Sequence, residues 1–167
     1  EEICNMANKK LYFYQLDVVD TSTGENVNDK FKQIFNQIVK DHFIDSTYED
    51  YSSGNPIETN IFSSNIEIDH KDISIDIIEN TNEYLFVRAG KAKDVSELAK
   101  RFKKQNRSQA VLAVDEDASI EIFAHFFIDY KKMIMGFILG QGAPRTNILQ
   151  AIFNKYQEKN RNIDCLM

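Results

Sequence analysis

Residues 83–107 read EYLFVRAGKAKDVSELAKRFKKQNR, a strand-like segment followed by a short glycine loop and a basic helix-like segment. The aromatic and branched residues of 83–89 predict a β-strand. Over residues 94–105 the apolar positions recur at helical spacing, at Val95, Leu98, Ala99 and Phe102. The first turn of this helix carries acids and its end carries Lys and Arg, as the helix dipole favours. We therefore predict that the chain is organised around this strand and basic helix.

The same stretch separates the charge of the chain. Residues 88–107 contain eight Lys or Arg and two acids, a net of +6, whereas the whole chain sums to −6, so the remainder carries −12. Residues 41–83 contain eleven acids and one base, Lys71, a net of −10. A basic segment beside an acidic one suggests binding of an acidic partner or association between copies of the chain.

Upstream of the acidic region, the pattern predicts one strand and one helix. Residues 10–19 alternate and are rich in aromatic and branched side chains, which predicts a strand. A turn at 20–24 precedes a helix that ends near His42 or Phe43, with Asn26 or Asn28 as its N-cap. Its apolar stripe consists of Val27, Phe31, Ile34, Phe35, Ile38 and Val39. Residues 44–60 are predicted to form a long polar loop.

The acidic region alternates apolar and charged residues in two short segments, 65–69 and 73–79. This pattern is typical of antiparallel strands with one buried face and one carboxylate-rich face. Asn80-Thr81-Asn82 fits a hairpin turn into the strand at 83–89.

The C-terminal half predicts three strands and a last helix. The strands are expected at 108–114, 123–128 and 133–139, with a turn at 129–132 and a loop at 140–144. A helix beginning at Thr146 carries Ile148, Leu149, Ile152, Phe153 and Tyr156 on one face. The order of elements predicts an α+β fold, a mainly antiparallel twisted sheet with about three helices packed on one face.

The length and composition of the chain fit a single domain. The chain has 167 residues, of which 43% are hydrophobic, and no apolar run approaches the roughly 20 residues of a membrane span. We expect a tail at 1–9, a single domain at 10–158 and a C-terminal tail at 159–167. Cys4 and Cys165 lie in these tails without a metal-binding spacing, and a reducing, cytoplasmic location without membrane contact is expected.

The binding hypothesis rests on the basic residues. Its candidate residues for contact with DNA, RNA or an acidic protein are Arg88, Lys91, Lys93, Lys100, Arg101, Lys103, Lys104 and Arg107. The alternative is that these basic residues form a solvent-exposed helix face without a partner, and that the acidic sheet of the same protein balances their charge. A second copy of the chain, giving a homodimer, is the expected protein partner.

An enzymatic function is the competing hypothesis. Asp69-His-Lys71 has an acid-x-Lys form seen in some magnesium nucleases, with Glu58, Glu67 and Asp72 as further carboxylates. The three histidines, His42, His70 and His125, share no ligand spacing, and no nucleophile motif is present. The sequence therefore favours a non-enzymatic protein, with no catalytic or metal-binding residue assigned and no cofactor predicted.

Several features of residues 83–156 occur together in one known group of proteins. They are the strand Tyr84-Leu-Phe-Val-Arg88, the Lys-rich segment with Asp94-Val-Ser-Glu97, the strand Val111-Leu-Ala-Val114 followed by acids, the pair Gly136-Phe137, and a Gly-Ala-Pro loop before the last helix. This order resembles the N-terminal part of the Rex-type phage-exclusion proteins of temperate phages, and several bacterial abortive-infection proteins. The resemblance covers less than half of the chain, and those proteins are usually longer. It implies an intracellular phage-defence or prophage protein that self-associates and contacts DNA.

Overall fold

The structure is a computed structural model that describes residues 10–50, 57–93, 120–139, 143–144, 147–156 and 163–166. In chain order its elements are β1 (Lys10–Gln15), β2 (Asp17–Asp20), a 3-10 turn η1 (Asn28–Lys30), α1 (Phe31–His42), β3 (Ile44–Asp50), β4 (Ile57–Ile68), β5 (Lys71–Asn80), β6 (Tyr84–Lys93), β7 (Ile120–Asp129), β8 (Ile134–Leu139), α3 (Ile148–Tyr156) and β9 (Ile163–Leu166).

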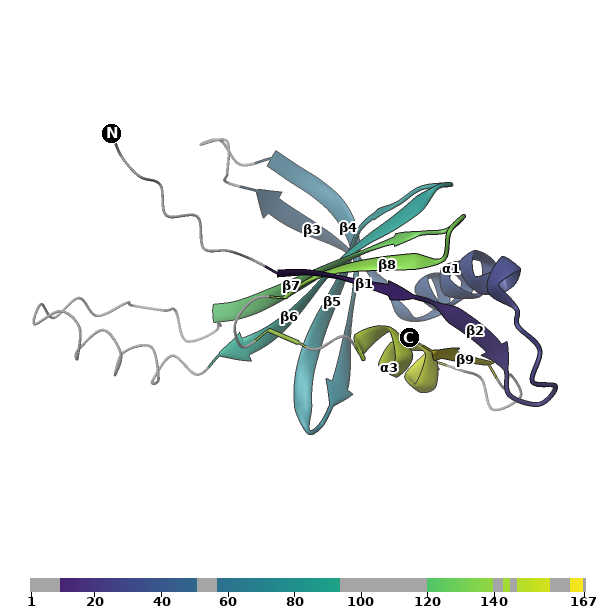
Figure 1. The fold of residues 1–167 in the computed structure, drawn as a ribbon. Helices are drawn as coiled ribbons and strands as arrows, with labels where there is room; N and C mark the ends of the chain where they lie inside the picture. The colour runs from purple at the N-terminus through teal and green to yellow at the C-terminus, as the bar shows by residue number, and fades with distance from the viewer. Residues whose placement is uncertain are drawn as a thin grey trace, which may run out of the picture.

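The strands form one large antiparallel sheet and one small one. The large sheet has seven strands in the order β1-β8-β7-β6-β5-β4-β3, and the small sheet pairs β2 with β9 (Figure 1). The predicted α+β class with a mainly antiparallel sheet is thus confirmed. The described residues contain two α-helices instead of three, and the other expected helix, at 94–105, lies outside them.

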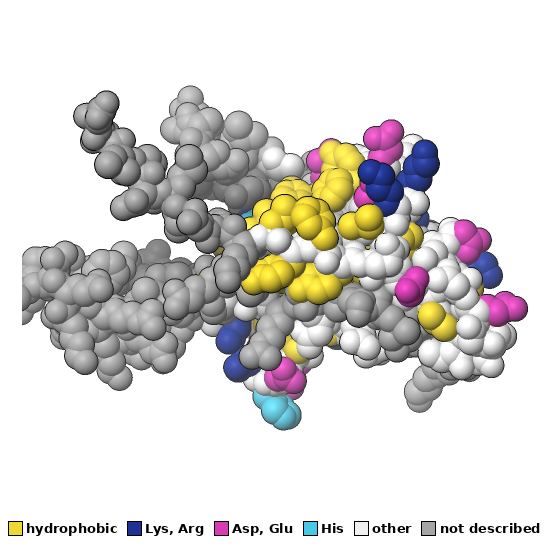
Figure 2. All heavy atoms as spheres, in the orientation of Figure 1, with side chains coloured by type: hydrophobic (Ala, Val, Ile, Leu, Met, Phe, Trp, Pro, Cys, Tyr) yellow, Lys and Arg dark blue, Asp and Glu magenta, His cyan; other side chains and the backbone are white. Residues whose placement is uncertain are grey.

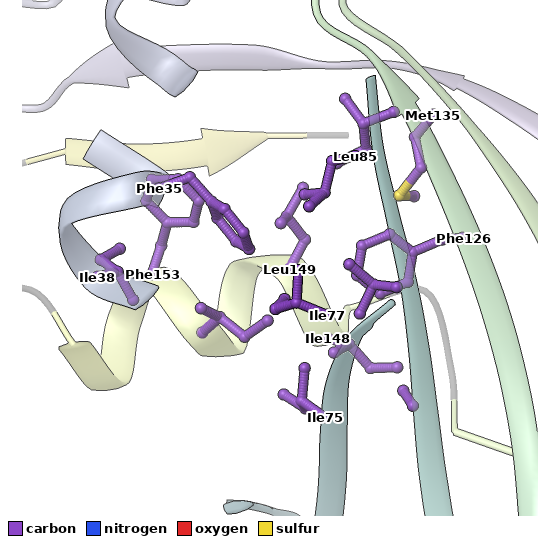
Figure 3. Close-up of a cluster of buried hydrophobic side chains, with 14 of the residues drawn as sticks. Phe35, Ile38, Ile75, Ile77, Leu85, Phe126, Met135, Ile148, Leu149 and Phe153 are labelled. Atoms are coloured by element: carbon purple, nitrogen blue, oxygen red, sulfur yellow. The ribbon is translucent and has the colours of Figure 1, made fainter. Parts of the chain in front are cut away.

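Both helices pack on the same face of the large sheet. Figure 3 shows Phe35 and Ile38 of α1 and Leu149 and Phe153 of α3 directed toward side chains of the strands. The strand side chains in this core include Ile75, Ile77, Leu85, Val87, Phe126, Ile128, Met135 and Phe137, all buried. Apolar residues at period two in the strands and at helical spacing in α1 and α3 therefore meet in one layer.

Tight turns join the central strands. The β4–β5 turn places Asp69 at φ 52° and His70 at φ 59°, the pair of positive angles that a two-residue type I′ hairpin requires. The predicted hairpin turn at 80–82 is confirmed: the Thr81 hydroxyl accepts hydrogen bonds from the backbone N–H groups of Glu83 and Tyr84, each at 3.1 Å. These turns set the register of β4, β5 and β6.

Two of the predicted strand and loop assignments are wrong. Residues 44–60, expected to be a loop, contain β3 and the start of β4; β3 is an edge strand, and its polar composition hid the strand pattern. The strand expected over 10–19 is two strands, because the chain leaves the large sheet at the buried Leu16 and continues as β2.

Neither asparagine caps α1. The helix follows η1, and its N-cap, Lys30, makes no side-chain capping bond. The Asn28 carboxamide oxygen accepts a hydrogen bond from the Val18 N–H at 2.7 Å and so ties η1 to β2.

The C-terminal part agrees with the pattern in α3 and adds one strand. Ile148, Leu149, Ile152 and Phe153 of α3 are buried, as their spacing predicted. Residues 163–166, within the expected tail, form β9 against β2. The predicted strand at 108–114, the expected tail at 1–9 and the expected cap at Thr146 lie outside the described residues.

Candidate functional site

The predicted basic residues are only partly within the described chain. Arg88, Lys91 and Lys93 belong to the C-terminal half of β6. Lys91 is half-buried and lies opposite Ile73 of β5 and Ile122 of β7. The other five candidates, Lys100, Arg101, Lys103, Lys104 and Arg107, lie outside the described residues.

Arg88 forms an internal ion pair. Its Nη2 and Nε atoms donate to Asp76 Oδ2 at 2.6 and 3.0 Å, and the exposed fractions of the two side chains are 13% and 11%. The Ser63 hydroxyl donates to Asp76 Oδ1 at 2.7 Å, and the guanidinium lies 4.5 Å from the ring centroid of Phe123. The charge of Arg88 is therefore compensated within the protein by Asp76, and its role in phosphate binding stays a prediction.

A glycine next to this ion pair allows a close contact between strands. A Cβ atom at Gly90 would lie 2.5 Å from Glu121 Oε2, 2.5 Å from Ser74 Oγ and 2.7 Å from the Phe123 ring. Because Gly90 has no side chain, Glu121 can accept a hydrogen bond from Ser74 at 3.1 Å across β6. The ion pair and this hydrogen bond together link the polar side chains of neighbouring strands on this face of the sheet.

Three carboxylates of the nuclease hypothesis, Glu67, Asp69 and Asp72, lie at the β4–β5 turn, whereas Glu58 lies near the other end of β4. Glu67 faces Asp72 across the two strands, and both are exposed. Asp69 occupies the turn itself. In the described ranges no three His, Cys, Asp or Glu side chains are grouped as for a metal ion.

A polar cluster joins α1 to the β5–β6 turn. Lys32 donates to Asn82 and Asn80 donates to Asn36, each at 2.8 Å, and the Tyr130 hydroxyl donates to Asn80 at 2.7 Å. The hollow beside them has a volume of about 420 Å³. These side chains satisfy one another and fix the helix against the turn, and burial raises the pKa of Tyr130.

The face of the large sheet that points away from α1 and α3, here called the outer face, has a polar part and an apolar part. One cross-strand row runs through Ser63, Asp76, Arg88, His125, Ile138 and Leu11, from β4 to β1. Along this row the side chains change from hydrogen-bonded polar groups to aliphatic groups. The apolar end therefore lies over β8 and the edge strand β1.

At this end a group of apolar side chains remains exposed. Of the seven large apolar side chains that are exposed in the described residues, five lie on β1, β7 and β8, and we call them the β1 patch: Leu11 (52% exposed), Tyr12 (38%), Phe13 (69%), Phe127 (41%) and Ile138 (37%). Figure 2 shows hydrophobic side chains gathered in one area over these strands. An exposed cluster of this kind is typical of an interaction surface.

Register explains why the four patch side chains on the outer face, Leu11, Phe13, Phe127 and Ile138, are continuous. Leu11 faces Ile138, and Phe13 faces Gly136, which in turn faces Phe127. The ring of Phe13 and the side chain of Leu11 lie 3.6 to 3.8 Å from the position of a Cβ at Gly136, so both cover the glycine. Tyr12 alternates to the other side of β1, where it faces the buried Phe137.

Stacked rings extend the patch toward β6. Tyr84 stacks on Phe127 with centroids 5.0 Å apart, and Phe86 stacks on His125 at 5.8 Å. A hydrogen bond from the Tyr84 hydroxyl to Glu79 raises the pKa of this tyrosine. The stacks hold these rings in defined positions beside the patch.

The sequence predicts the strand that carries three of the five patch residues but indicates no function for it. Its signal was present: Leu11, Tyr12, Phe13 and Tyr14 are consecutive apolar or aromatic residues, so both sides of the strand are apolar. Exposure depends on the position of β1 at the sheet edge, which the pattern alone does not specify.

Comparison with known proteins identified no matching family model, no matching curated protein and no matching solved structure. No helix in the described part of the chain is long and apolar enough to cross a membrane.

Proposed function

We propose that this protein is a non-enzymatic interaction domain that self-associates through the β1 patch. The observation that carries the proposal is the concentration of exposed apolar side chains on β1 and its neighbours β8 and β7. Burying such a surface against a partner removes apolar area from water, and this is the main favourable term in most protein associations. The patch contains no charged side chain whose desolvation would oppose association.

Sedimentation velocity over a concentration series tests this proposal. The weight-average mass should rise from 19.4 kDa toward twice that value as the protein concentration increases. Phe13→Lys should abolish the rise, because it places a charge at the most exposed apolar side chain of β1. Phe62→Lys is the matched control, an exposed phenylalanine on β4, five strands away in the sheet. A mass of 19.4 kDa up to hundreds of micromolar would refute self-association.

A second proposal concerns an acidic partner, nucleic acid or protein, bound by the basic segment. The supporting observation is the charge separation in the sequence. Because Asp76 compensates Arg88, the segment that remains is 91–107, with seven bases and two acids, a net of +5. A phosphate backbone would be attracted by such a segment, and the affinity would fall with rising salt, because binding releases counterions and their release is less favourable at high salt concentration.

Fluorescence anisotropy with DNA and RNA in a salt series tests this second proposal. Replacing Lys100, Lys103 and Lys104 together by Glu should abolish binding, whereas Lys131→Glu with Lys132→Glu, at the exposed β7–β8 turn, should not. Equal binding by both variants would refute the basic segment as the binding site, and no binding by the wild type at low salt would exclude nucleic acid as the partner.

The resemblance to Rex-type phage-exclusion proteins suggests a setting for both activities, phage defence in the bacterial cytoplasm. Expression in a bacterial host should then lower the plating efficiency of a sensitive phage. If plating efficiency does not change across a panel of temperate and lytic phages, this setting is wrong, while the two binding proposals stand on their own tests.

A further inference from the structure

We propose that β1 pairs with β1 of a second copy of the chain, antiparallel and edge to edge, so that two seven-stranded sheets join into one. This inference rests on the proposed self-association and specifies its geometry. It starts from the place of β1 at one end of the large sheet, where an edge strand presents backbone N–H and C=O groups for pairing. No other described strand pairs with that edge.

The two edges of the large sheet differ in their protection against pairing. The other edge strand, β3, has the sequence IDSTYED, with three acids among seven residues. Two β3 strands placed edge to edge would bring these acids together, which is how many proteins prevent such pairing. In contrast, β1 has the sequence KLYFYQ, with three aromatic residues, one lysine and no acid. Only the β1 edge is thus suited to pair with its own copy.

The net charge of the chain favours a contact that carries no acids. Two copies that each carry −6 repel one another, and the repulsion is smallest where the surfaces that meet carry no acid. The β1 patch meets this condition, because none of its five side chains is charged. A nucleic acid would require cations in the patch to contact its phosphates, and the sequence of β1 offers Lys10 alone.

A two-fold axis perpendicular to the sheet, midway between the Tyr12 residues of the two copies, makes the strand complementary to itself. Residues directly opposite each other in an antiparallel pair point to the same face. Leu11 of each copy then lies opposite Phe13 of the other copy on the outer face, so the two most exposed side chains of β1 cover each other. Tyr12 meets Tyr12 of the second copy on the helix-bearing face. Such an arrangement closes as a dimer and leaves no free β1 edge.

The size of the surface predicts moderate affinity. A fully buried aromatic residue contributes 150–250 Å², so the exposed fractions of Leu11, Tyr12 and Phe13, the patch residues on the paired edge, correspond to roughly 100 Å² each, or about 300 Å² per copy. The backbone of β1 adds to this area. The total falls below the roughly 800 Å² per partner of a standard interface, and we expect a dimer that dissociates in the micromolar range.

Site-specific oxidation of the full chain distinguishes this geometry from other dimers. In a Cys4→Ser, Cys165→Ser background, Tyr12→Cys should give a disulfide-linked dimer, because the two-fold axis places residue 12 of both copies side by side. The matched control, Phe62→Cys, has an exposed position on β4 and should give none. Adding Phe13→Lys to Tyr12→Cys should remove the cross-link.

A second variant covers the case in which cysteine at position 12 weakens pairing. Leu11→Cys with Phe13→Cys should cross-link twice, through residue 11 of each copy to residue 13 of the other. If sedimentation shows a dimer but neither variant cross-links more than Phe62→Cys, edge pairing is refuted and self-association stands. If sedimentation shows a monomer at every concentration, both proposals fall together. Unchanged circular dichroism of Phe13→Lys would establish that its effect is not unfolding.

Discussion

Removing Arg88 should destabilise the protein more than its position near the sheet surface suggests. Arg88→Met keeps most of the aliphatic volume but deletes the two hydrogen bonds to Asp76 Oδ2, at 2.6 and 3.0 Å. The Asp76 carboxylate, with 11% of its side chain exposed, then keeps only the hydrogen bond from Ser63. The variant therefore leaves a nearly buried charge without its counterion.

The expected loss of stability follows from the burial of this unpaired carboxylate. Breaking a buried pair by removing one partner costs about 3–5 kcal/mol, and the small remaining exposure of both side chains places Arg88→Met near the lower end, about 3 kcal/mol. The loss of the contact between the guanidinium and the Phe123 ring, 4.5 Å apart, acts in the same direction. Asp76→Leu should lower the free energy of unfolding by a similar amount, because it leaves the guanidinium of Arg88 without its counterion.

The double variant provides the decisive comparison. With Asp76→Leu and Arg88→Met together, neither charge of the pair remains, and the stability should return to within about 1 kcal/mol of the wild type. Urea unfolding followed by circular dichroism gives the free energy of unfolding for all four proteins. Arg88→Met costing less than about 1 kcal/mol, or a double variant less stable than either single one, would refute the reasoning. Because Arg88 is already paired, Arg88→Met should also leave nucleic-acid binding by the folded protein unchanged.

Three further substitutions test the fold. Phe153→Ala should lower the free energy of unfolding by about 3–5 kcal/mol, since this fully buried ring stacks on Phe31 at 5.7 Å; thermal unfolding measures the loss, and a change below half that range would contradict the described core. Gly90→Ala should cost about 1–2 kcal/mol in urea unfolding, because its Cβ displaces Glu121, Ser74 and Phe123; no cost would mean that β6 and β7 do not approach as described. His70→Gly should stabilise the protein by about 1 kcal/mol, because glycine adopts φ 59° without steric cost; a destabilised variant would show that the turn has another conformation.

Local pattern was sufficient for the elements of the core. The period-two apolar positions of β5, at Ile73, Ile75 and Ile77, and the helical stripe of α3 both predicted the buried face correctly. These predictions succeed because alternation and helical spacing involve residues two to four positions apart, whose relation depends on backbone geometry alone. The turn at 80–82 was predictable for the same reason.

Pattern failed where the decisive neighbour is distant in sequence. The polar residues of 44–50 form a strand because β4 supplies their hydrogen bonds, and Arg88 is compensated because the register of β5 and β6 places Asp76 opposite it. Charge counting treated Arg88 as part of a basic surface, since a sum over sequence contains no information about pairing across strands.

By itself, the sequence determined which residues of β1 are apolar and that the acids are concentrated in 41–83. Tertiary structure decided that β1 is an edge strand paired with β8, more than 110 residues later in the chain, and that the two described helices lie on one face of the sheet (Figure 3). The physical reason is that hydrophobicity belongs to a side chain, whereas exposure depends on what the rest of the chain places over it. The same aromatic residues on a central strand would be core, and at the edge they form a surface for a partner.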